Sequence, residues 1–438
     1  MKTDYLIIGA GAMGIAFADE IFHLRPNSHI TIVDRRPKAG GHWNDAYPFV
    51  RLHQPAAFYG VNSSKLGNGR ADLSSKSEIL NYYDKVISKF TSSGRVTFLP
   101  NHNYLGNGQV KDLQHPDRTL SFAVNKRLVD ATYMNVEVPS THAPKYKIED
   151  GVNIVPINDL AEEYNKWDKY YVIGSGKTGM DAVLFLLEKK VPADNIYWIS
   201  PNQSWMFNRS ALQVGKVAKV VLRHADYATK VSCANDIFVE MEKEGSIMRI
   251  NEDVSPPKWR CATVSPEELA ALRKIKNIIE KGRVSSITKG VIQLEKGDVT
   301  YAGKALFVDC SANGISKRKQ EPIFSKEKIT LQSILFCQQV FSAAIIARLE
   351  LTNISDKKKN KAQPVPHPEY IEDWPGAMSV SIQNLLEAHR RFPLWMFRSR
   401  LNFMSHEPIS NYFYYALKAN MVSSSLTRAA KRMEDAAP

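Results

Sequence analysis

The stretch Tyr5-Leu-Ile-Ile-Gly9-Ala-Gly11-Ala-Met-Gly14 decides the fold of this chain. Its apolar start predicts a buried parallel strand, and the glycine-rich turn that follows opens a helical pattern. Gly9 permits the tight turn, Gly11 lets the backbone approach a pyrophosphate, and Gly14 lets the helix pack closely on the strand. Free N–H groups at the start of such a helix favour an anion. The stretch therefore predicts the phosphate-binding turn of a dinucleotide site.

A second apolar run, Ile30-Thr-Ile-Val33, ends in the acidic residue Asp34. In this motif an acid at the end of the second strand accepts hydrogen bonds from a ribose diol. Because strand, turn, helix, strand and acid follow in order, a nucleotide site explains the glycines better than chance does. We expect contacts to the first dinucleotide from Gly9, Gly11, Ala12, Met13, Gly14, Asp34, Arg35, Gly41, His42 and Trp43.

The same pattern recurs about 165 residues later, in Tyr170-Tyr-Val-Ile-Gly174-Ser-Gly176-Lys-Thr-Gly179. The matching second strand, Asn195-Ile-Tyr-Trp-Ile, ends in Ser200 rather than in an acid. Two such turns predict two dinucleotide sites, and a duplicated scaffold that uses only one of them is the alternative. We expect contacts to the second dinucleotide from Gly174, Ser175, Gly176, Lys177, Thr178, Gly179, Ser200 and Arg209.

The length of 438 residues predicts two or three domains, and 44% apolar with 24% charged residues excludes a largely disordered chain. The net charge of +13 suits anionic cofactors as well as nucleic acid. No nucleic-acid motif accompanies the charge, so we expect no nucleic-acid partner. The first apolar run leads straight into the glycine turn, which argues against a signal peptide and for a cytoplasmic protein. Ser333 to Leu351 contains Gln338, Gln339 and Arg348, and it predicts a core helix rather than a membrane span.

The four cysteines, Cys233, Cys261, Cys310 and Cys337, lie far apart in the sequence. They form no CxxC pair and have no metal-like spacing. We therefore expect scattered reduced thiols, no metal site and no disulfide-reductase chemistry.

The segment from Asp45 to Gly60 contains two prolines and many aromatic residues, which predicts a long irregular loop. Long loops inside a compact domain are usually functional. Three polar residues, Arg51, His53 and Gln54, stand among its apolar ones and are the candidate catalytic residues, with Arg51 also expected at the cofactor. The alternative is that Arg51 and His53 are ordinary surface residues of a loop.

The expected fold class is α/β, with two Rossmann-like GxGxxG dinucleotide-binding domains, a small antiparallel insertion and a helical C-terminal tail. Residues 1–150 and 300–350 form the first domain in this scheme, residues 151–299 the second with a helical insertion, and residues 351–438 the tail. Short strands between Val96 and Thr132 predict the antiparallel insertion. The strand that ends at Asp309 is expected to return the chain to the first domain, where Asp309 would accept a hydrogen bond from a cofactor hydroxyl. A polar strand end without a ligand is the alternative.

The tail interleaves aromatic with basic residues, in Arg390-Arg-Phe-Pro-Leu-Trp395-Met-Phe-Arg and again in Tyr412-Phe-Tyr-Tyr-Ala-Leu-Lys418. Aromatic residues at helical spacing predict an amphipathic helical pair that covers the core or the active site. Peripheral contact with a membrane surface is the alternative.

The two glycine turns, Asp34 and Gly40-Gly41-x-Trp43 together resemble the class B flavoprotein monooxygenases, which comprise the flavin-containing and the Baeyer–Villiger monooxygenases. The resemblance covers about residues 4 to 345. It implies that the first turn holds FAD and the second holds NADPH. Tyr47-Pro48-x-x-Arg51-x-His53 also resembles a Baeyer–Villiger run that lies against the flavin, and Ser200-Pro-Asn-Gln-Ser-Trp205 resembles a stretch of the NADPH domain.

The chain departs from that family in ways that mark a diverged branch. His53 stands where the Baeyer–Villiger run has Asp, and the FxGxxxH signature between the nucleotide domains is absent. Ser200 takes the place of an arginine that binds the 2′-phosphate, and serine cannot pair bidentately with a phosphate. Lys177 or Arg209 could substitute for it, so the expected nicotinamide is NADPH or NADH.

The resemblance implies an FAD-dependent, NAD(P)H-using oxidoreductase, foremost a monooxygenase that acts on a small organic substrate and O2 through a flavin peroxide. In this hypothesis Arg51 stabilises developing negative charge, and His53 or Gln54 donates or relays a proton. The alternatives are an FAD reductase or oxidase without oxygen insertion, and a catalytically silent nucleotide-binding regulatory protein. The sequence predicts neither the substrate nor the oligomeric state.

Overall fold

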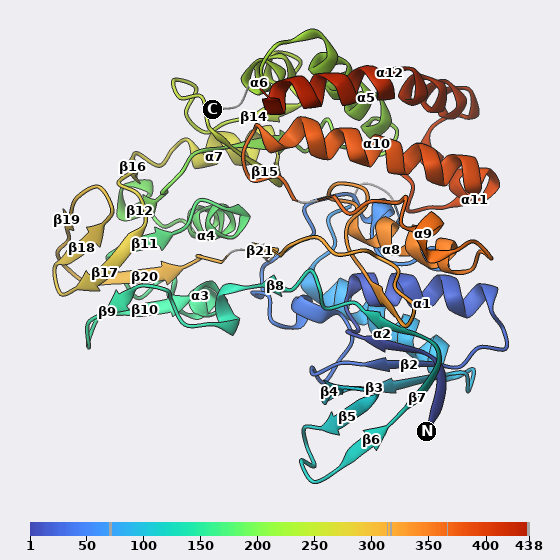
Figure 1. Ribbon diagram of the computed structural model, residues 1–438. Coiled ribbons are helices and arrows are strands. Elements are labelled where there is room, and N and C mark those ends of the chain that lie inside the picture. The colour runs from blue at the N-terminus through green and yellow to red at the C-terminus, as the bar shows by residue number, and fades with distance from the viewer. Residues whose placement is uncertain (70–71, 313, 316–317, 366, 436–438) are drawn as a thin grey trace.

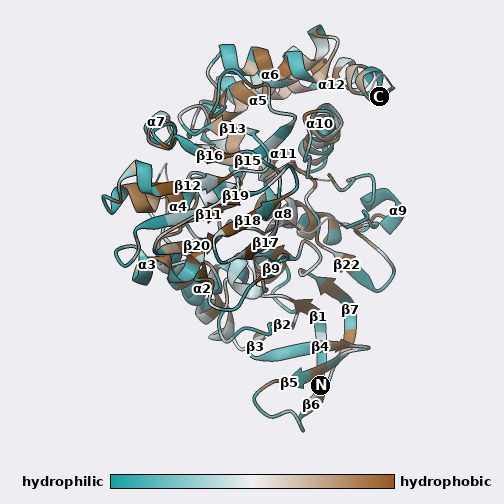
Figure 2. Cartoon of the chain, turned by 90° about the vertical axis from the view of Figure 1, so that its left-hand side faces the viewer, coloured by the Kyte–Doolittle hydropathy of each residue, from teal (hydrophilic) through white to brown (hydrophobic). Residues whose placement is uncertain are grey.

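The computed structural model describes residues 1–69, 72–312, 314–315, 318–365 and 367–435. Two parallel sheets form the lower and the left-hand parts of the view in Figure 1, and the C-terminal helices lie together at the top. The strands of both sheets carry many hydrophobic residues, whereas the helices carry both hydrophobic and hydrophilic ones (Figure 2). This distribution is the one expected when helices cover the faces of parallel sheets.

The first sheet has five parallel strands around the first glycine turn. Helix α1 (Ala12–Leu24) follows directly on its central strand and packs against α8 (Gln339–Glu350). Helix α2 (Lys76–Thr91) begins at a capping box, in which Ser75 and Glu78 satisfy each other's backbone N–H groups. The strand order is β22 (Lys328–Thr330), β7 (Ala123–Asp130), β1 (Lys2–Ile8), β2 (Ile30–Val33) and β3 (Val96–Leu99).

The second sheet repeats this plan around the second glycine turn, again with five parallel strands. Helix α4 (Lys177–Glu188) follows directly on its central strand. The strand order is β10 (Ile154–Pro156), β20 (Ala305–Asp309), β11 (Lys169–Ile173), β12 (Ile196–Ile199) and β16 (Asn277–Ile279).

Strand β20 lies in the second sheet, whereas we expected it in the first. The expectation that the strand ending at Asp309 returns to the first domain is wrong, because β20 pairs with β10 and with β11, where Asp309 lies opposite Ile173. After β20 the chain returns to the first sheet at β22, which pairs with β7. The residues of β20 are all buried, and a fully buried apolar run fits a central position in either sheet, so its pattern could not choose between them.

The antiparallel insertion is confirmed, but it is smaller than expected. It consists of β4 (His102–Gly106), β5 (Gln109–Asp112) and β6 (Thr119–Ser121). Two segments that we assigned to the same meander, Val96–Leu99 and the residues from Arg127 to Asp130, instead lie in β3 and β7 of the first sheet, where they pair in parallel with β2 and β1. That part of the prediction is wrong.

Further elements extend the second sheet toward the C-terminal helices. A mixed sheet of β14 (Ile247–Met248), β13 (Ser204–Asn208) and β15 (Lys258–Val264) lies beside α5 (Val217–Lys230), α6 (Ala234–Lys243) and α7 (Pro266–Leu272). A second small sheet is formed by β19 (Val299–Thr300), β18 (Val291–Leu294), β17 (Val284–Thr288) and β9 (Lys147–Ile148). The short elements β8 (Val136–Glu137), β21 (Gly314–Ile315), α3 (Leu160–Glu163) and α9 (Asp356–Lys359) complete this list.

The C-terminal helices cover α5 and the core beneath it. They are α10 (Asp373–Arg391), α11 (Pro393–Arg398) and α12 (Ile409–Asp435), and α12 packs against both α10 and α5. The expected amphipathic helical pair is therefore present, with Trp374 and Leu426 among its fully buried side chains. Within the described ranges, no helix combines the length and the hydropathy that crossing a membrane requires.

Candidate functional site

A cleft with a volume of about 1100 Å³ lies between the ends of β11 and β12 of the second sheet and α10. Its walls come from the loop after Trp43, from the second glycine turn, from β15, from the segment before α8 and from α10. Four buried polar atoms on these walls have no hydrogen-bond partner among the described residues: Nδ1 of His53, the hydroxyl oxygen of Tyr146, Oγ of Ser333 and Oε1 of Gln338. Buried polar atoms are nearly always paired, so their presence here indicates a ligand-binding cleft.

The first glycine turn has the close helix–strand packing that the motif requires. Gly9 adopts a φ of 105°, and a Cβ on Gly14 would lie 2.1 Å from the carbonyl oxygen of Gly9. The buried carboxylate of Asp34 accepts hydrogen bonds from the N–H groups of Ala10, at 2.7 Å, and of Arg36, at 2.8 Å. A carboxylate has about four lone-pair sites, so Asp34 retains acceptor capacity for two ribose hydroxyls.

Backbone from the next segment faces the N-terminus of α1. Gly41, with a φ of 59°, would place a Cβ 2.9 Å from the Cα of Gly11. Trp43 follows in a short 3-10 helix (Gly41–Asn44), and its indole N–H donates to the hydroxyl of Tyr59 at 2.7 Å. The backbones of Gly11 and Gly41 thus meet at the N-terminus of α1 with no side chain between them. Because a helix N-terminus attracts an anion, this arrangement fits a bound pyrophosphate.

The second glycine turn has the same internal geometry but opens into the cleft. Gly174 has a φ of 127°, and a Cβ on Gly179 would lie 2.0 Å from the carbonyl oxygen of Gly174. A Cβ on Gly176 would meet no atom within 4 Å. Gly174, Ser175, Gly176, Lys177 and Thr178 all line the cleft.

The two cations expected to replace a phosphate-binding arginine are both held by carboxylates. Lys177 pairs with Asp181 one turn along α4, and Arg209 makes two contacts with Glu268, at 2.6 and 3.1 Å. Ser200 is buried at the end of β12, where its N–H donates to the carbonyl of Ile279. The charges at this turn are therefore largely balanced within the chain.

The three candidate catalytic residues all line the cleft, in different environments. Arg51 is exposed at its rim and donates to the carbonyl of Leu73 at 3.2 Å. The imidazole of His53 faces the second turn: burial, followed by the charges of Lys177 and Arg209, lowers its pKa to about 4. His53 is consequently neutral near pH 7, where its unprotonated ring nitrogen can accept a hydrogen bond. Gln54 lines the same wall.

Asp309 lies beside the second turn rather than the first. Its buried carboxylate accepts from the N–H of Ser311 at 3.0 Å and from the hydroxyl of Ser311 at 2.5 Å. The following residue, Cys310, approaches Gly174 through its carbonyl. Asp309 thus caps a local turn at the end of β20, and its contact with a cofactor hydroxyl stays a prediction.

Contacts that the sequence did not reveal join the loop after Trp43 to α4. The hydroxyl of Tyr47 donates to the carboxylate of Asp181 at 2.5 Å, and the ring of Phe49 stacks on Phe185 with centroids 4.1 Å apart. The aromatic content of this loop was the only sequence signal for such contacts. They connect the part of the chain next to the first turn with the helix of the second.

The C-terminal tail fixes the same loop from its other side. The guanidinium of Arg400 donates to the carbonyls of four loop residues at 2.7 to 3.1 Å: Ala56, Ala57, Tyr59 and Val61. Burial lowers the pKa of Arg400. The interleaving of basic and aromatic residues in the tail hinted at a covering role, but it did not identify this arginine or its partners.

The cysteine prediction is wrong for one pair. Cys261 and Cys337, 76 residues apart, form a disulfide, whereas Cys233 is exposed and free and Cys310 is buried and free, as expected. Both bonded cysteines line the cleft. A pair brought together only by the tertiary fold leaves no spacing signal in the sequence.

Sequence comparisons find relatives along most of the chain, although no family model matches it. An uncharacterized protein of Mycobacterium tuberculosis is 39% identical over 434 residues, which cover 93% of this chain and 80% of that protein, and a Mycobacterium bovis protein is equally similar. A probable FAD-binding monooxygenase of an Acinetobacter species, AlmA, is 23% identical over 336 residues, or 68% of this chain and 66% of that protein.

Structure comparison identifies the fold. A polycyclic ketone monooxygenase from Thermothelomyces thermophila matches with a TM-score of 0.54 at 11% identity, over 98% of this chain and 88% of that one. OTEMO in complex with FAD and NADP matches with a TM-score of 0.52 at 13% identity, over 80% of this chain and 84% of that one. At such identities the likeness establishes the fold, which is the one that the sequence resemblance implied.

Proposed function

The chain belongs to one family with the mycobacterial proteins and has the fold of the ketone monooxygenases, and we propose that it is an FAD-dependent oxidoreductase that uses NAD(P)H. The observation that carries this proposal is the pair of equivalent glycine turns, in which the third glycine packs so closely on the first that an added Cβ would lie 2.1 or 2.0 Å from its carbonyl oxygen. OTEMO, which shares the fold, binds both FAD and NADP. We assign FAD to the first turn and the nicotinamide to the second, next to the cleft.

The residues at the first turn fit FAD. Gly9, Gly11 and Gly14 bring backbone to the pyrophosphate, Asp34 accepts from the ribose, and Gly41 faces Gly11 without a side chain. When bound, FAD supplies the hydride acceptance and the oxygen chemistry of the reaction. The chain's own part is to hold that group and to exclude water from the cleft.

The loop after Trp43 supplies polar groups to the reacting region in this proposal. His53 offers a neutral imidazole whose buried Nδ1 is unpaired among the described residues, so this atom can accept or donate a proton. Arg51 provides positive charge at the rim, and Gln54 lies beside them. Substrate and O2 would enter the same cleft, which is large enough for a small organic molecule beside a nicotinamide.

The paired cations at the second turn bear on the choice of nicotinamide. Lys177 and Arg209 are each neutralised by a carboxylate, so neither offers the free charge that a 2′-phosphate needs. We expect a weaker preference for NADPH over NADH than a free arginine at position 200 would produce. Ser200→Arg should raise the preference for NADPH by about tenfold or more, which corresponds to one charge-assisted hydrogen bond of ~1.5 kcal/mol.

Anaerobic stopped-flow spectroscopy of the purified protein tests the proposed function. We expect bound FAD, bleaching of the flavin by NADH or NADPH, and rapid reoxidation by O2. Arg51→Ala and His53→Ala should lower turnover or the coupling of NAD(P)H use to product, and Asp34→Ala should lower the FAD content. Unchanged turnover and coupling in both loop variants would refute their assignment.

The same experiment separates the alternatives. Hydrogen peroxide formed in equal amount to the NAD(P)H consumed, with every candidate substrate, would show a reductase or oxidase. FAD that does not bleach with either nicotinamide would show a catalytically silent nucleotide-binding protein. Oxygen incorporated from ¹⁸O2 into a small organic product would establish the monooxygenase.

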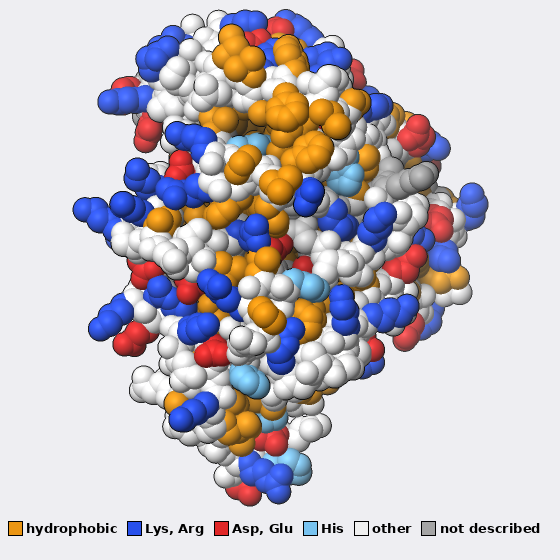
Figure 3. Space-filling view, turned by 90° about the vertical axis from the view of Figure 1, so that its right-hand side faces the viewer, with side chains coloured by type: hydrophobic (Ala, Val, Ile, Leu, Met, Phe, Trp, Pro, Cys, Tyr) orange, Lys and Arg blue, Asp and Glu red, His pale blue; other side chains and the backbone are white. Residues whose placement is uncertain are grey.

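The outer face of α12 supports a proposed peripheral contact with an anionic membrane. Hydrophobic side chains gather on the upper part of the surface in Figure 3, and more than half of each of the following is exposed: Leu394, Ile409, Phe413, Tyr414, Leu417 and Met421. No acidic residue occurs in α12 before Glu434, while Arg390 and Arg398 are exposed nearby. Apolar side chains flanked by cations fit the interface of an anionic bilayer.

Vesicle binding tests this contact. Full-length protein should co-sediment with phosphatidylserine vesicles more than with neutral ones, and the double substitution Phe413→Ser/Leu417→Ser should abolish the difference. Sedimentation that is equal for the two vesicle types, or a dimer that the same substitutions dissociate, would overturn the membrane proposal.

A further inference from the structure

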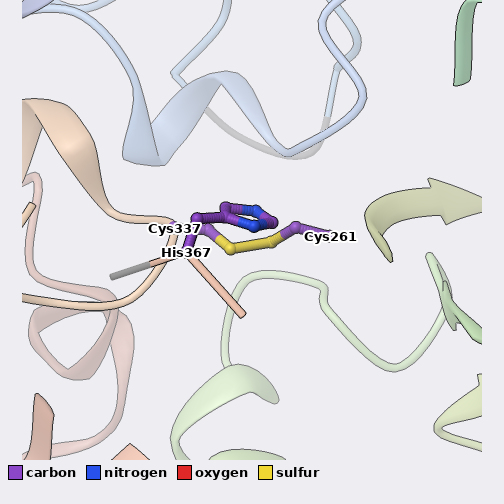
Figure 4. Close-up of side chains that lie close together, drawn as sticks. All are labelled: Cys261, Cys337 and His367. Carbon is purple, nitrogen blue, oxygen red and sulfur yellow. A yellow bond between two sulfur atoms is a disulfide. The ribbon is translucent and has the colours of Figure 1, made fainter. Parts of the chain in front are cut away.

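Three metal-ligating side chains meet on the wall of the cleft. Cys261 lies in β15, Cys337 stands just before α8, and His367 belongs to the segment that leads to α10. Both sulfur atoms and an imidazole nitrogen of His367 lie within 4.8 Å of one another. Figure 4 shows the imidazole ring alongside the sulfur–sulfur bond.

The hydrogen bonding of His367 suits a metal ligand. Its Nδ1 lies 3.0 Å from the carbonyl oxygen of Pro368, which can only accept, so Nδ1 carries the proton. That tautomer leaves the lone pair on Nε2 free for a cation. Histidines that bind metals characteristically donate their other ring N–H to a carbonyl or a carboxylate in this way.

The ligand set determines which ion would fit. Two thiolates and one imidazole are the soft sulfur and nitrogen donors that Zn²⁺ prefers, and their two negative charges neutralise the ion. In tetrahedral coordination the two sulfurs are about 3.8 Å apart, from Zn–S bonds of about 2.3 Å. The sulfurs of a disulfide are about 2.0 Å apart, so opening the bond to bind the ion requires them to separate by about 1.8 Å.

We propose that Cys261, Cys337 and His367 form a redox-controlled Zn²⁺ site on the wall of the cleft. In the oxidised protein the disulfide excludes the ion. In the reduced protein two thiolates and one imidazole bind it, and the fourth position faces the cleft, open to water or to a small ligand. Zinc sites with three protein ligands and an open position are typical of catalytic rather than structural zinc.

The chemistry of opening the site balances with an external reductant. A water-soluble trialkylphosphine breaks the sulfur–sulfur bond: the phosphine is oxidised to its oxide with oxygen from water, and Cys261 and Cys337 become thiols. Zn²⁺ then displaces two protons as the thiolates form bonds to it. These steps involve neither FAD nor a nicotinamide, so the proposal stands apart from the proposed function.

Zinc titration of the full-length protein tests the site. One portion is kept oxidised and one is reduced with the phosphine and desalted under argon, and each is titrated with Zn²⁺ against a chromophoric chelator. We expect one Zn²⁺ per chain in the reduced portion and none in the oxidised portion. Co²⁺ should give a thiolate charge-transfer band in the reduced portion alone.

Matched variants assign the ligands. Cys261→Ser should abolish Zn²⁺ binding, and His367→Ala should weaken it by more than the roughly 10- to 100-fold that follows loss of an outer-sphere partner. Cys233→Ser is the control, because Cys233 is exposed and unbonded, and it should bind one Zn²⁺ as the unaltered protein does. If Cys261→Ser fails to fold, alkylation of the reduced protein with iodoacetamide takes its place and should likewise abolish binding.

Two results would overturn the site. The first is a reduced protein that binds no more Zn²⁺ than the oxidised protein. The second is Zn²⁺ binding that survives both Cys261→Ser, or alkylation, and His367→Ala.

Discussion

The two glycine turns of this chain have the same local geometry and different surroundings. In both, a Cβ on the third glycine would lie about 2 Å from the carbonyl oxygen of the first, at 2.1 Å for Gly14 and 2.0 Å for Gly179. The middle glycines differ: Gly11 faces the backbone of Gly41, whereas Gly176 faces open space. The glycine spacing therefore specifies the turn, and a segment elsewhere in the chain decides whether the turn is covered.

The two turns also differ in how polar groups are used. Asp34 at the end of β2 accepts from two backbone N–H groups, so this acid supports the turn itself in addition to its proposed contact with a ribose. Ser200 at the end of β12 is not acidic, and the nearby cations Lys177 and Arg209 are bound by carboxylates. This contrast matches the proposed assignment of FAD to the covered first turn and of an exchanging nicotinamide to the open second turn.

The prediction with the largest expected effect tests whether the two glycine turns have the same local geometry. Gly14→Ala and Gly179→Ala should each lower the free energy of unfolding by about 3 kcal/mol or more, because the new Cβ must displace a backbone carbonyl. Urea unfolding measures this. The control is Gly376→Ala in α10, where a Cβ meets no atom within 4 Å and helix propensity should add up to about 1 kcal/mol. Losses that differ widely between Gly14→Ala and Gly179→Ala would contradict the equivalence of the turns.

The second prediction concerns the histidine that faces the second turn from the loop of the first. The pKa of His53 is about 4 in the folded protein against about 6.5 in an unfolded chain, so the unfolded state binds more protons between these values. Stability should fall by up to about 3 kcal/mol as the pH drops from 6.5 to 4. His53→Gln should remove this loss, measured as the unfolding free energy against pH.

A residual pH dependence should remain in that variant, because burial and Arg36 also lower the pKa of His42 to about 4. The exposed His115→Gln serves as the control and should follow the unaltered protein. If the unfolding free energy depends on pH in the same way in His53→Gln and in the unaltered protein, His53 is not held neutral in the folded state.

The third prediction tests the difference between the covered and the open turn. Gly41→Ala should cost about 2 kcal/mol, because Gly41 has a positive φ and its Cβ would meet the Cα of Gly11 at 2.9 Å. Gly176→Ala should cost less than about 1 kcal/mol, the difference between glycine and alanine at a helix N-cap. Its effect should appear instead as weaker NAD(P)H binding with unchanged FAD content, measured by titration. Equal costs in stability would contradict the contrast.

The smallest expected effect tests the link between the turns. Tyr47→Phe removes the hydrogen bond to Asp181 and should cost about 1 kcal/mol. A double-mutant cycle with Asp181→Asn isolates this bond from the ion pair that Asp181 makes with Lys177. A coupling free energy near zero would show that the link does not contribute to stability.

Sequence patterns anticipated much of the fold, because the relevant physics is local. Both strand–turn–helix units occur where the glycines predicted them, since a φ above 100° at Gly9 and at Gly174 is accessible to glycine and strained for other residues. The core helix α8 followed from its mostly apolar composition, and the amphipathic tail helices followed from apolar periodicity. The candidate residues of the loop after Trp43 do line the cleft, although their roles stay predictions.

The errors occurred where the sequence carries no local signal. The apolar run of β20 fits the centre of either sheet, and only strand pairing assigns it to the second. The disulfide joins residues 76 positions apart, and Arg400 binds carbonyls more than 330 positions away. Such contacts depend on how helices, strands and loops pack against one another, and the spacing of residues along the sequence does not predict that packing.

The sequence by itself determined the two glycine turns of this protein, because backbone sterics at glycine and the period of apolar residues act within a few positions. The tertiary structure alone decided that one turn is covered and the other opens into the cleft. It also decided that His53 is neutral, and that Cys261, Cys337 and His367 meet. Burial, electrostatics and ligand geometry depend on distances between segments, and only the folded chain sets those distances.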